Sequence, residues 1–263
     1  MNLSTNSKYA LVVIIGVIVV STPIILMMPP AEEPPNEVTL TLLINEGVMI
    51  EAKGLRIYID PLYLPDNYTE LPADVILVTH PHSDHYSPQD IEEIMTDDTL
   101  FVCPANMTDA IDRFDGFGVN PGDTFQVGDI NITAFCMYMP DYAENPSFHQ
   151  KSSNWTSFII EIDGFRIYHA GDSKYMEELG ELTGTIDVAF LPIYYDPGYG
   201  PLNESLYPIV EAIELLQPNY TIPVHFNDYT HLMFFSEYSI LVDNPNCEIL
   251  EWEWFDSRVF ELG

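Results

Sequence analysis

Positive charge is scarce in this 263-residue sequence, in which eight lysines and arginines stand against 41 aspartates and glutamates, a formal net charge of −33. Such an acidic surface repels the phosphate backbone of DNA or RNA, and no stripe of basic residues is present to release its counterions. We therefore expect no nucleic-acid partner. High-salt or acidic surroundings also favour carboxylate-rich surfaces, so the charge alone identifies no partner.

Cysteine is also scarce, with only Cys103, Cys136 and Cys247 in the chain. They are widely separated and form no Cys-x-x-Cys pair, which argues against thiolate metal ligands and against a disulfide framework. The spacing predicts three buried apolar side chains, and a single disulfide stays open if two of them meet.

A long uncharged apolar run covers residues 9–28. It matches the roughly 20 residues that a bilayer-spanning helix needs, so it predicts a membrane anchor. A lysine precedes the run and two glutamates follow it, so the positive-inside rule places residues 1–8 in the cytoplasm and the remaining chain outside the cell. The expected localisation is a single-pass cell-membrane protein with an extracellular domain. Pro23 leaves a cleaved signal peptide as the alternative, although no small-x-small cleavage site follows Met28.

Residues 29–37 are rich in proline and glutamate and predict a stiff linker. Residues 38–263 then form one domain, long enough for a full hydrophobic core. Sequons within it predict a glycoprotein, although each short match is weak alone; they begin at Asn67, Asn106, Asn131, Asn154, Asn203 and Asn219.

Hydrophobic periodicity and turn residues predict alternating strands and helices. The predicted strands are 38–44, 48–52, 55–60, 74–78, 100–103, 124–127, 130–138, 155–162, 165–169, 187–191 and 220–224. The predicted helices are 87–95, 108–114, 203–216 and one beginning near Ser173.

Three of the seven histidines lie within Thr79-His-Pro-His-Ser-Asp-His-Tyr86, directly after an apolar strand. His80 and His82 stand two apart, so in an extended backbone their side chains leave the same face and can converge on one cation. Asp84 and His85 are adjacent and can hold a second cation as the chain curls into the next helix. The alternative is a polar loop that caps the strand, but such loops are normally built from Gly, Asn, Asp and Ser.

This His-x-His-x-Asp-His pattern resembles the metallo-β-lactamase superfamily. Within that superfamily, the sequence motifs of the chain are most similar to those of small stand-alone hydrolases such as the ascorbate-phosphate lactonases. The resemblance covers residues 38–250 and includes further motifs in the same order, at 56–61, 148–151, 168–173, 191–193 and 222–225. It implies a four-layer αββα sandwich of α/β class.

The resemblance also implies a ligand set for two metals. One metal would be held by His80, His82 and His149, the other by Asp84, His85 and His225, with Asp172 bridging both. The glycine before Asp172 allows a close approach of the backbone, and a carboxylate has two oxygens to share.

Two further residues acquire roles from their place beneath this set. In the resembling family an aspartate at the position of Asp60 orients a ligand histidine, although a turn cap explains it equally well. His169 is expected to be buried below the metals.

The loop 194–199 departs from the family by being rich in tyrosine, which suggests substrate contact or a packed aromatic loop.

Nitrogen and oxygen ligands without thiolate favour zinc, two ions per chain, with manganese or iron as alternatives. Two cations about 3.5–4 Å apart would lower the pKa of a shared water to about 7. We expect Asp84 to orient this nucleophile or shuttle its proton, while His231 is either a proton donor or a residue near a helix start.

The sequence thus predicts a metal-dependent hydrolase that cleaves an ester, lactone or phosphodiester bond in a small-molecule or lipid-derived substrate. The alternative is a non-catalytic, metal-containing surface protein with a binding or scaffold role on the same fold. The sequence leaves the oligomeric state open.

Overall fold

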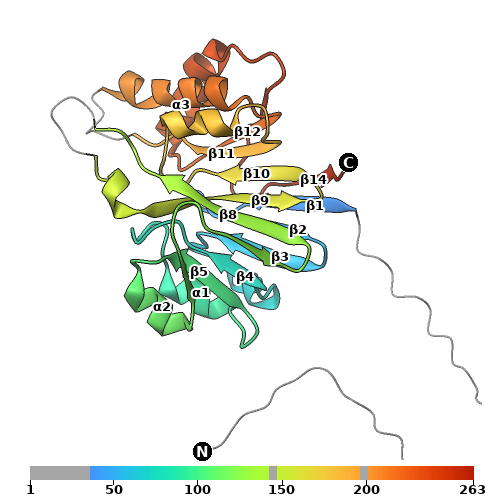
Figure 1. Cartoon of the computed structure of the whole chain (residues 1–263). Helices are drawn as coiled ribbons and strands as arrows, with labels where there is room; N and C mark the ends of the chain where they lie inside the picture. The colour runs from blue at the N-terminus through green and yellow to red at the C-terminus, as the bar shows by residue number, and fades with distance from the viewer. Residues whose placement is uncertain (1–35, 142–146, 196–200) are drawn as a thin grey trace, which may run out of the picture. The chain divides into compact units, whose positions relative to one another are not determined.

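The computed structural model describes residues 36–263 apart from 142–146 and 196–200. Within these residues two seven-stranded sheets face each other (Figure 1). The first has the order β14-β1-β2-β3-β4-β5-β6, made of β1 (Glu37–Leu42), β2 (Val48–Ala52), β3 (Leu55–Ile59), β4 (Val75–Leu77), β5 (Leu100–Pro104), β6 (Phe117–Val119) and β14 (Ser257–Glu261). The second has the order β13-β12-β11-β10-β9-β8-β7, made of β7 (Thr124–Val127), β8 (Ile130–Met137), β9 (Trp155–Ile162), β10 (Phe165–His169), β11 (Val188–Pro192), β12 (Tyr220–Val224) and β13 (Glu248–Ile249).

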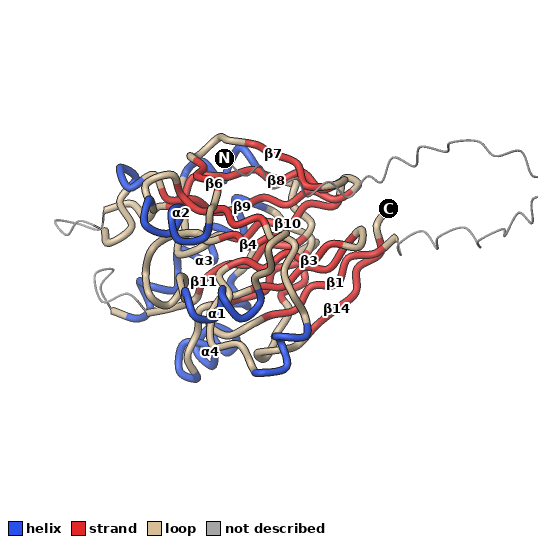
Figure 2. Tube along the Cα trace, turned by 90° about the horizontal axis from the view of Figure 1, so that it is seen from below, coloured by secondary structure: helices blue, strands red, loops and turns tan. Residues whose placement is uncertain are grey.

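Helices cover the outer face of each sheet. α1 (Pro88–Ile94) and α2 (Thr108–Phe114) cover the first sheet and lie in front of its strands in Figure 2. α3 (Leu202–Leu216) and α4 (Asp228–Met233) lie on the side of the second sheet (Figure 1). The predicted αββα sandwich is therefore present.

Period-two alternation explains why the sheets pack in this way. On β1, Val38, Leu40 and Leu42 are fully buried in the cluster between the two sheets. On β10, Ile167 points into this central cluster, whereas Tyr168 points to the cluster beneath α3. Sheets that are covered on both faces need such apolar residues on both sides of a strand.

Tight turns join the antiparallel strands. Lys53 and Gly54 between β2 and β3 both have positive φ angles, 53° and 75°, as the two-residue turn of a twisted hairpin requires. In contrast, β3 to β6 run parallel to one another, and so do β10 to β13. The carboxyl ends of parallel strands meet at one edge, so the loops after β4, β10 and β12 converge there.

Three details differ from the sequence prediction. Residues 173–176 form no helix; a 3-10 helix covers Glu177–Leu182 instead. The strands β6, β13 and β14 were not predicted, because each is short or has few buried residues. All three cysteines are free, and only Cys103 is fully buried.

The predicted localisation, a single-pass cell-membrane protein with an extracellular domain, is contradicted. No helix in the described part of the chain is both long and apolar enough to cross a bilayer. The longest of them, α3, has 15 residues, fewer than the roughly 20 that a span requires. The predicted segments 1–8 and 9–28 and most of the linker 29–37 lie outside the described residues. Glycosylation stays a prediction.

Candidate metal centre

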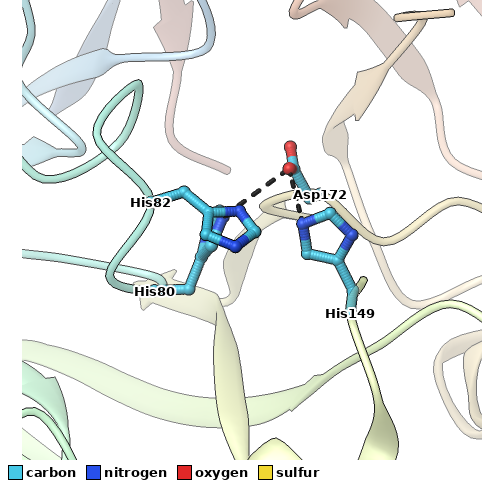
Figure 3. A group of neighbouring side chains, drawn as sticks. All are labelled: His80, His82, His149 and Asp172. Atoms are coloured by element: carbon cyan, nitrogen blue, oxygen red, sulfur yellow. Dashed lines mark hydrogen bonds and ion pairs between the residues drawn. The ribbon is translucent and has the colours of Figure 1, made fainter. Parts of the chain in front are cut away.

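The first group of side chains gathers where β4, β9 and β10 meet. His80 and His82 follow β4, His149 lies in the loop before β9, and Asp172 follows β10. One ligand-type atom of each lies within 4.8 Å of the others, and Figure 3 shows the three imidazoles and the carboxylate pointing toward one another. The side chain of His80 is fully buried and that of His149 is 6% exposed.

The second group contains Asp84, His85 and His225, whose ligand-type atoms also lie within 4.8 Å of one another. His225 follows β12 and has a φ of 52°, a left-handed conformation that a non-glycine residue adopts at a cost. Asp84 is the exposed member, with half of its side-chain surface open to solvent (51%).

Asp172 lies between the two groups and turns one oxygen toward each. Its Oδ2 is 2.8 Å from His149 Nε2 and 3.6 Å from His80 Nε2. Its Oδ1 is 3.2 Å from His85 Nε2 and 3.3 Å from His225 Nε2. The sequence-predicted residues are thus brought together in the arrangement that a bridging carboxylate requires.

Gly171 is needed for this close approach. Its φ is 55°, and a Cβ atom built on it would lie 2.5 Å from Met137 Sδ and 3.2 Å from Thr79 Cβ. Any other residue at this position, next to Asp172 in the chain, would have a strained backbone and would overlap Met137 and Thr79.

We expect Gly171→Ala to lower the free energy of unfolding by about 2–3 kcal/mol, since it adds steric overlap to the cost of a left-handed backbone. Gly164→Ala is the matched control. Gly164 also has a positive φ, 86°, but no atom lies within 4 Å of the place that a Cβ would take there, so only about 1 kcal/mol should be lost. Urea unfolding measures both, and equal losses would contradict the role assigned to close packing at Gly171.

Asp60 fixes the orientation of two of the imidazoles from below. The Thr79 backbone N–H and hydroxyl donate to Asp60, at 2.8 Å and 2.5 Å, and the hydroxyl lies 3.0 Å from His80 Nδ1. His85 Nδ1 lies 3.1 Å from Asp60 Oδ2. Because acceptors face Nδ1 of His80 and His85, both rings can donate a proton from Nδ1, and the Nε2 atom of each ring lies on the side of Asp172.

Sequence reasoning missed Asn45 and Glu46, which lie in the turn between β1 and β2. Asn45 Nδ2 donates to the Asp84 carbonyl at 2.9 Å, and its own carbonyl accepts the His225 N–H at 2.8 Å. Glu46 is fully buried, and its Oε1 lies 2.8 Å from His85 Nδ1. This turn therefore contacts all three members of the second group. No local pattern signals these contacts, because a turn residue with long-range partners looks like any other.

The charges of the cluster act on one another. Burial and the neighbouring His85 charge lower the pKa of His80 to about 4, which keeps its imidazole neutral and able to act as a ligand. Burial raises the pKa of Asp172, but His85 and His225 outweigh this and hold it well below its usual value. The hydrogen bond with His225 lowers the pKa of Asp84. Both carboxylates are thus ionised.

The donor set fits cations placed between the groups. Within the described residues His85 Nε2 and Asp172 Oδ1 are buried without a hydrogen-bond partner and lie 3.2 Å apart. Buried polar atoms are rarely left in this state, and here they face one another. A cation bound by the imidazole nitrogens and the carboxylate would satisfy them.

The third buried cluster, Glu46, Asp60 and His169, does not fit a metal. His169 Nε2 donates to the Glu46 carbonyl at 2.7 Å, while its Nδ1 accepts the Gly171 N–H at 3.3 Å. Both nitrogens are therefore occupied. His169 lies fully buried below the site, where the sequence predicted it.

His231 lies in neither metal-ligand group among the described residues. Its ring packs between Phe226 and Phe235, at centroid distances of 4.7 Å and 4.8 Å, and its Nδ1 is 4.0 Å from Glu251. The proton-donor role stays a prediction.

Tyr194 belongs to the packed frame of the site. Its ring lies 4.6 Å from that of His225, and its hydroxyl donates to the Asp172 carbonyl at 3.2 Å. The buried Lys174 ammonium donates to the Tyr194 carbonyl at 2.8 Å and lies 4.1 Å from the ring centre. Residues 196–200 of the predicted loop lie outside the described part.

Comparisons with known proteins identify the family of the chain. The model of the beta-lactamase superfamily domain matches residues 56–226. A UPF0173 metal-dependent hydrolase of Archaeoglobus fulgidus is 30% identical over 203 residues, which cover 72% of this chain and 84% of the relative. A protein with the same description from Thermococcus onnurineus is 33% identical over 187 residues, covering 66% and 78%.

Among solved structures, the metallo hydrolase Igni18 from Ignicoccus hospitalis superposes with a TM-score of 0.66 and covers 86% of this chain and 99% of its own. At 21% identity this likeness shows the shared fold. The superfamily that the His-x-His-x-Asp-His motif predicted is confirmed, and the chain belongs to the beta-lactamase superfamily, as one of its metal-dependent hydrolases.

Proposed function

We propose that the protein is a binuclear zinc hydrolase that cleaves an ester, lactone or phosphodiester bond. The observation that supports this most strongly is the position of Asp172, whose two oxygens face two separate histidine groups. A single-metal site would leave one of these groups without a cation to hold.

Each group supplies the ligands of one ion. His80, His82 and His149 would hold the first ion, Asp84, His85 and His225 would hold the second, and Asp172 would contribute one oxygen to each. Imidazole and carboxylate donors without thiolate suit zinc, and they also accept manganese or iron. When bound, the two ions would lower the pKa of a water molecule and withdraw charge from the oxygen of the bond under attack.

Asp84 carries the proton transfer in this proposal. It is the solvent-open member of the cluster, and its Oδ2 lies 3.4 Å from His225 Nε2. Its ionised carboxylate can orient the attacking water, accept its proton and deliver that proton to the leaving group. The buried imidazoles cannot do so, because their second nitrogens are engaged or enclosed.

The substrate in this proposal is a small molecule, including lipid-derived ones. The acidic surface, with its net charge of −33, disfavours nucleic acid as a phosphodiester substrate.

Metal removal tests the proposal. We expect the full-length protein to hydrolyse at least one of three generic probes: a 4-nitrophenyl ester, a γ-lactone or bis(4-nitrophenyl) phosphate. Chelation followed by dialysis should abolish this activity, and zinc should restore it. Hydrolysis that survives complete metal removal would contradict the mechanism. A metal-loaded protein inactive on every probe would favour the non-catalytic binding protein instead.

A further inference from the structure

A groove with a volume of about 480 Å³ lies beside the histidines, between the loops that follow β4 and β5 and the start of β9. Tyr86, Met107 and Trp155 provide its large apolar surfaces. The Asn106 amide donates to the Ser153 carbonyl at 2.7 Å, which ties the two opposite walls together. The groove thus joins apolar surfaces to a polar edge made by Asn106, Thr108, Asp109 and Ser153.

The groove borders the first histidine group through Trp155. The Trp155 ring centre lies 5.0 Å from that of His82 and 5.8 Å from that of His149. Pro81, which also lines the groove, stands between His80 and His82 in the chain. A molecule whose reacting bond lies at the histidines can therefore extend across Trp155 into this groove.

The charge of the groove limits what it accepts. None of the described residues that line it is a lysine or an arginine, and Asp109 is the acidic one among them. A bound anion would find no positive partner there, whereas aromatic faces and a thioether favour flat apolar groups.

We propose that this groove binds an uncharged aromatic or apolar part of the substrate and thereby selects against substrates that carry an anionic group at that position. The inference rests on the proposed hydrolase function and extends it to a substrate class. Trp155 is the contact surface, and Asp109 is the residue that sets the charge preference.

Equilibrium binding tests the groove without turnover. The probes are 4-nitrobenzyl alcohol, which is neutral, and 4-nitrobenzoate, which is its anionic counterpart. Binding to the full-length protein is followed by quenching of Trp155 fluorescence, and Trp155→Phe identifies the part of the signal that comes from the groove. We expect saturable binding of the alcohol and at least fivefold weaker binding of the benzoate.

Two charge-reversal variants on α2, one inside the groove and one outside it, test the charge preference. Asp109→Lys should strengthen benzoate binding roughly fivefold, because it places a cation beside the carboxylate. Asp112→Lys makes the same change in net charge at an exposed position three residues further along α2, outside the groove, and should leave benzoate binding unchanged.

The outcomes separate the groove from the catalytic proposal. Equal effects of the two lysine variants, or no saturable binding of the alcohol, would overturn the groove assignment even if the protein hydrolyses esters. The groove assignment is supported if the protein prefers the alcohol and if Asp109→Lys, but not Asp112→Lys, strengthens benzoate binding. This result would support the groove even if no hydrolysis were found and the proposed activity failed.

Discussion

Replacing Asp172 by asparagine is expected to reduce kcat/KM by more than about 100-fold. Loss of a residue that only hydrogen-bonds to a metal ligand typically costs about 10–100-fold, and Asp172 is proposed to be a ligand itself. Asparagine keeps the shape of the side chain but removes the charge that faces both histidine groups, at 2.8 Å from His149 and 3.2 Å from His85. Elemental analysis should show that the bound metal falls together with the activity.

The control for this change is Asp90→Asn. Asp90 is another buried aspartate, 7% exposed, but it accepts hydrogen bonds from Leu64 N–H and the Ser87 hydroxyl at the start of α1. The variant should lose stability without losing metal. If Asp172→Asn retained full metal content and activity, the bridging role would be wrong.

Replacing Glu46 by glutamine is expected to weaken metal binding at the second group roughly 10–100-fold, while the first group keeps its metal. The Glu46 carboxylate lies 2.8 Å from His85 Nδ1, and burial raises its pKa, so its charge is kept in the interior only by partners such as this ring. Glutamine would face the same N–H without a charge, and the His85 ring would be a weaker ligand.

Competition with a chelator, followed by metal analysis, measures this effect. Glu51→Gln is the matched control, since Glu51 lies on β2 close to Glu46 in sequence but pairs with Arg56 at 2.7 Å at the surface. Similar metal loss in both variants would point to a general effect of removing negative charge. If Glu46→Gln left the metal affinity of the second group unchanged, Asp60 would be sufficient to orient His85 without Glu46.

Most of the fold could be predicted because its signals are local. Lys53-Gly54 indicates a hairpin wherever it stands between two alternating runs, and β2 begins and ends where predicted, at Val48 and Ala52. The candidate ligands His80 and His82 follow from their two-residue spacing at the end of a strand. His149, Asp172 and His225 needed the family resemblance, because an isolated loop histidine or Gly-Asp pair carries little information.

The support beneath the metal centre could not be predicted, because its contacts span the chain. Asn45 reaches Asp84 across 39 residues, and the Glu46 carbonyl accepts from His169 across 123. The helix predicted from Ser173 is absent for a related reason: the buried Lys174 makes its hydrogen bonds to Ser205 and Tyr194, far along the chain. These long-range contacts outweigh the local helix signal.

The most direct test of the two-metal centre is the metal content of the full-length protein, determined by elemental analysis after purification without chelators and after zinc reconstitution. We expect about two ions per chain, one for each histidine group, and a fall in Asp172→Asn together with hydrolysis. A folded, active protein that holds no metal, or only one ion at saturation, would contradict the two-group centre that Asp172 is proposed to bridge.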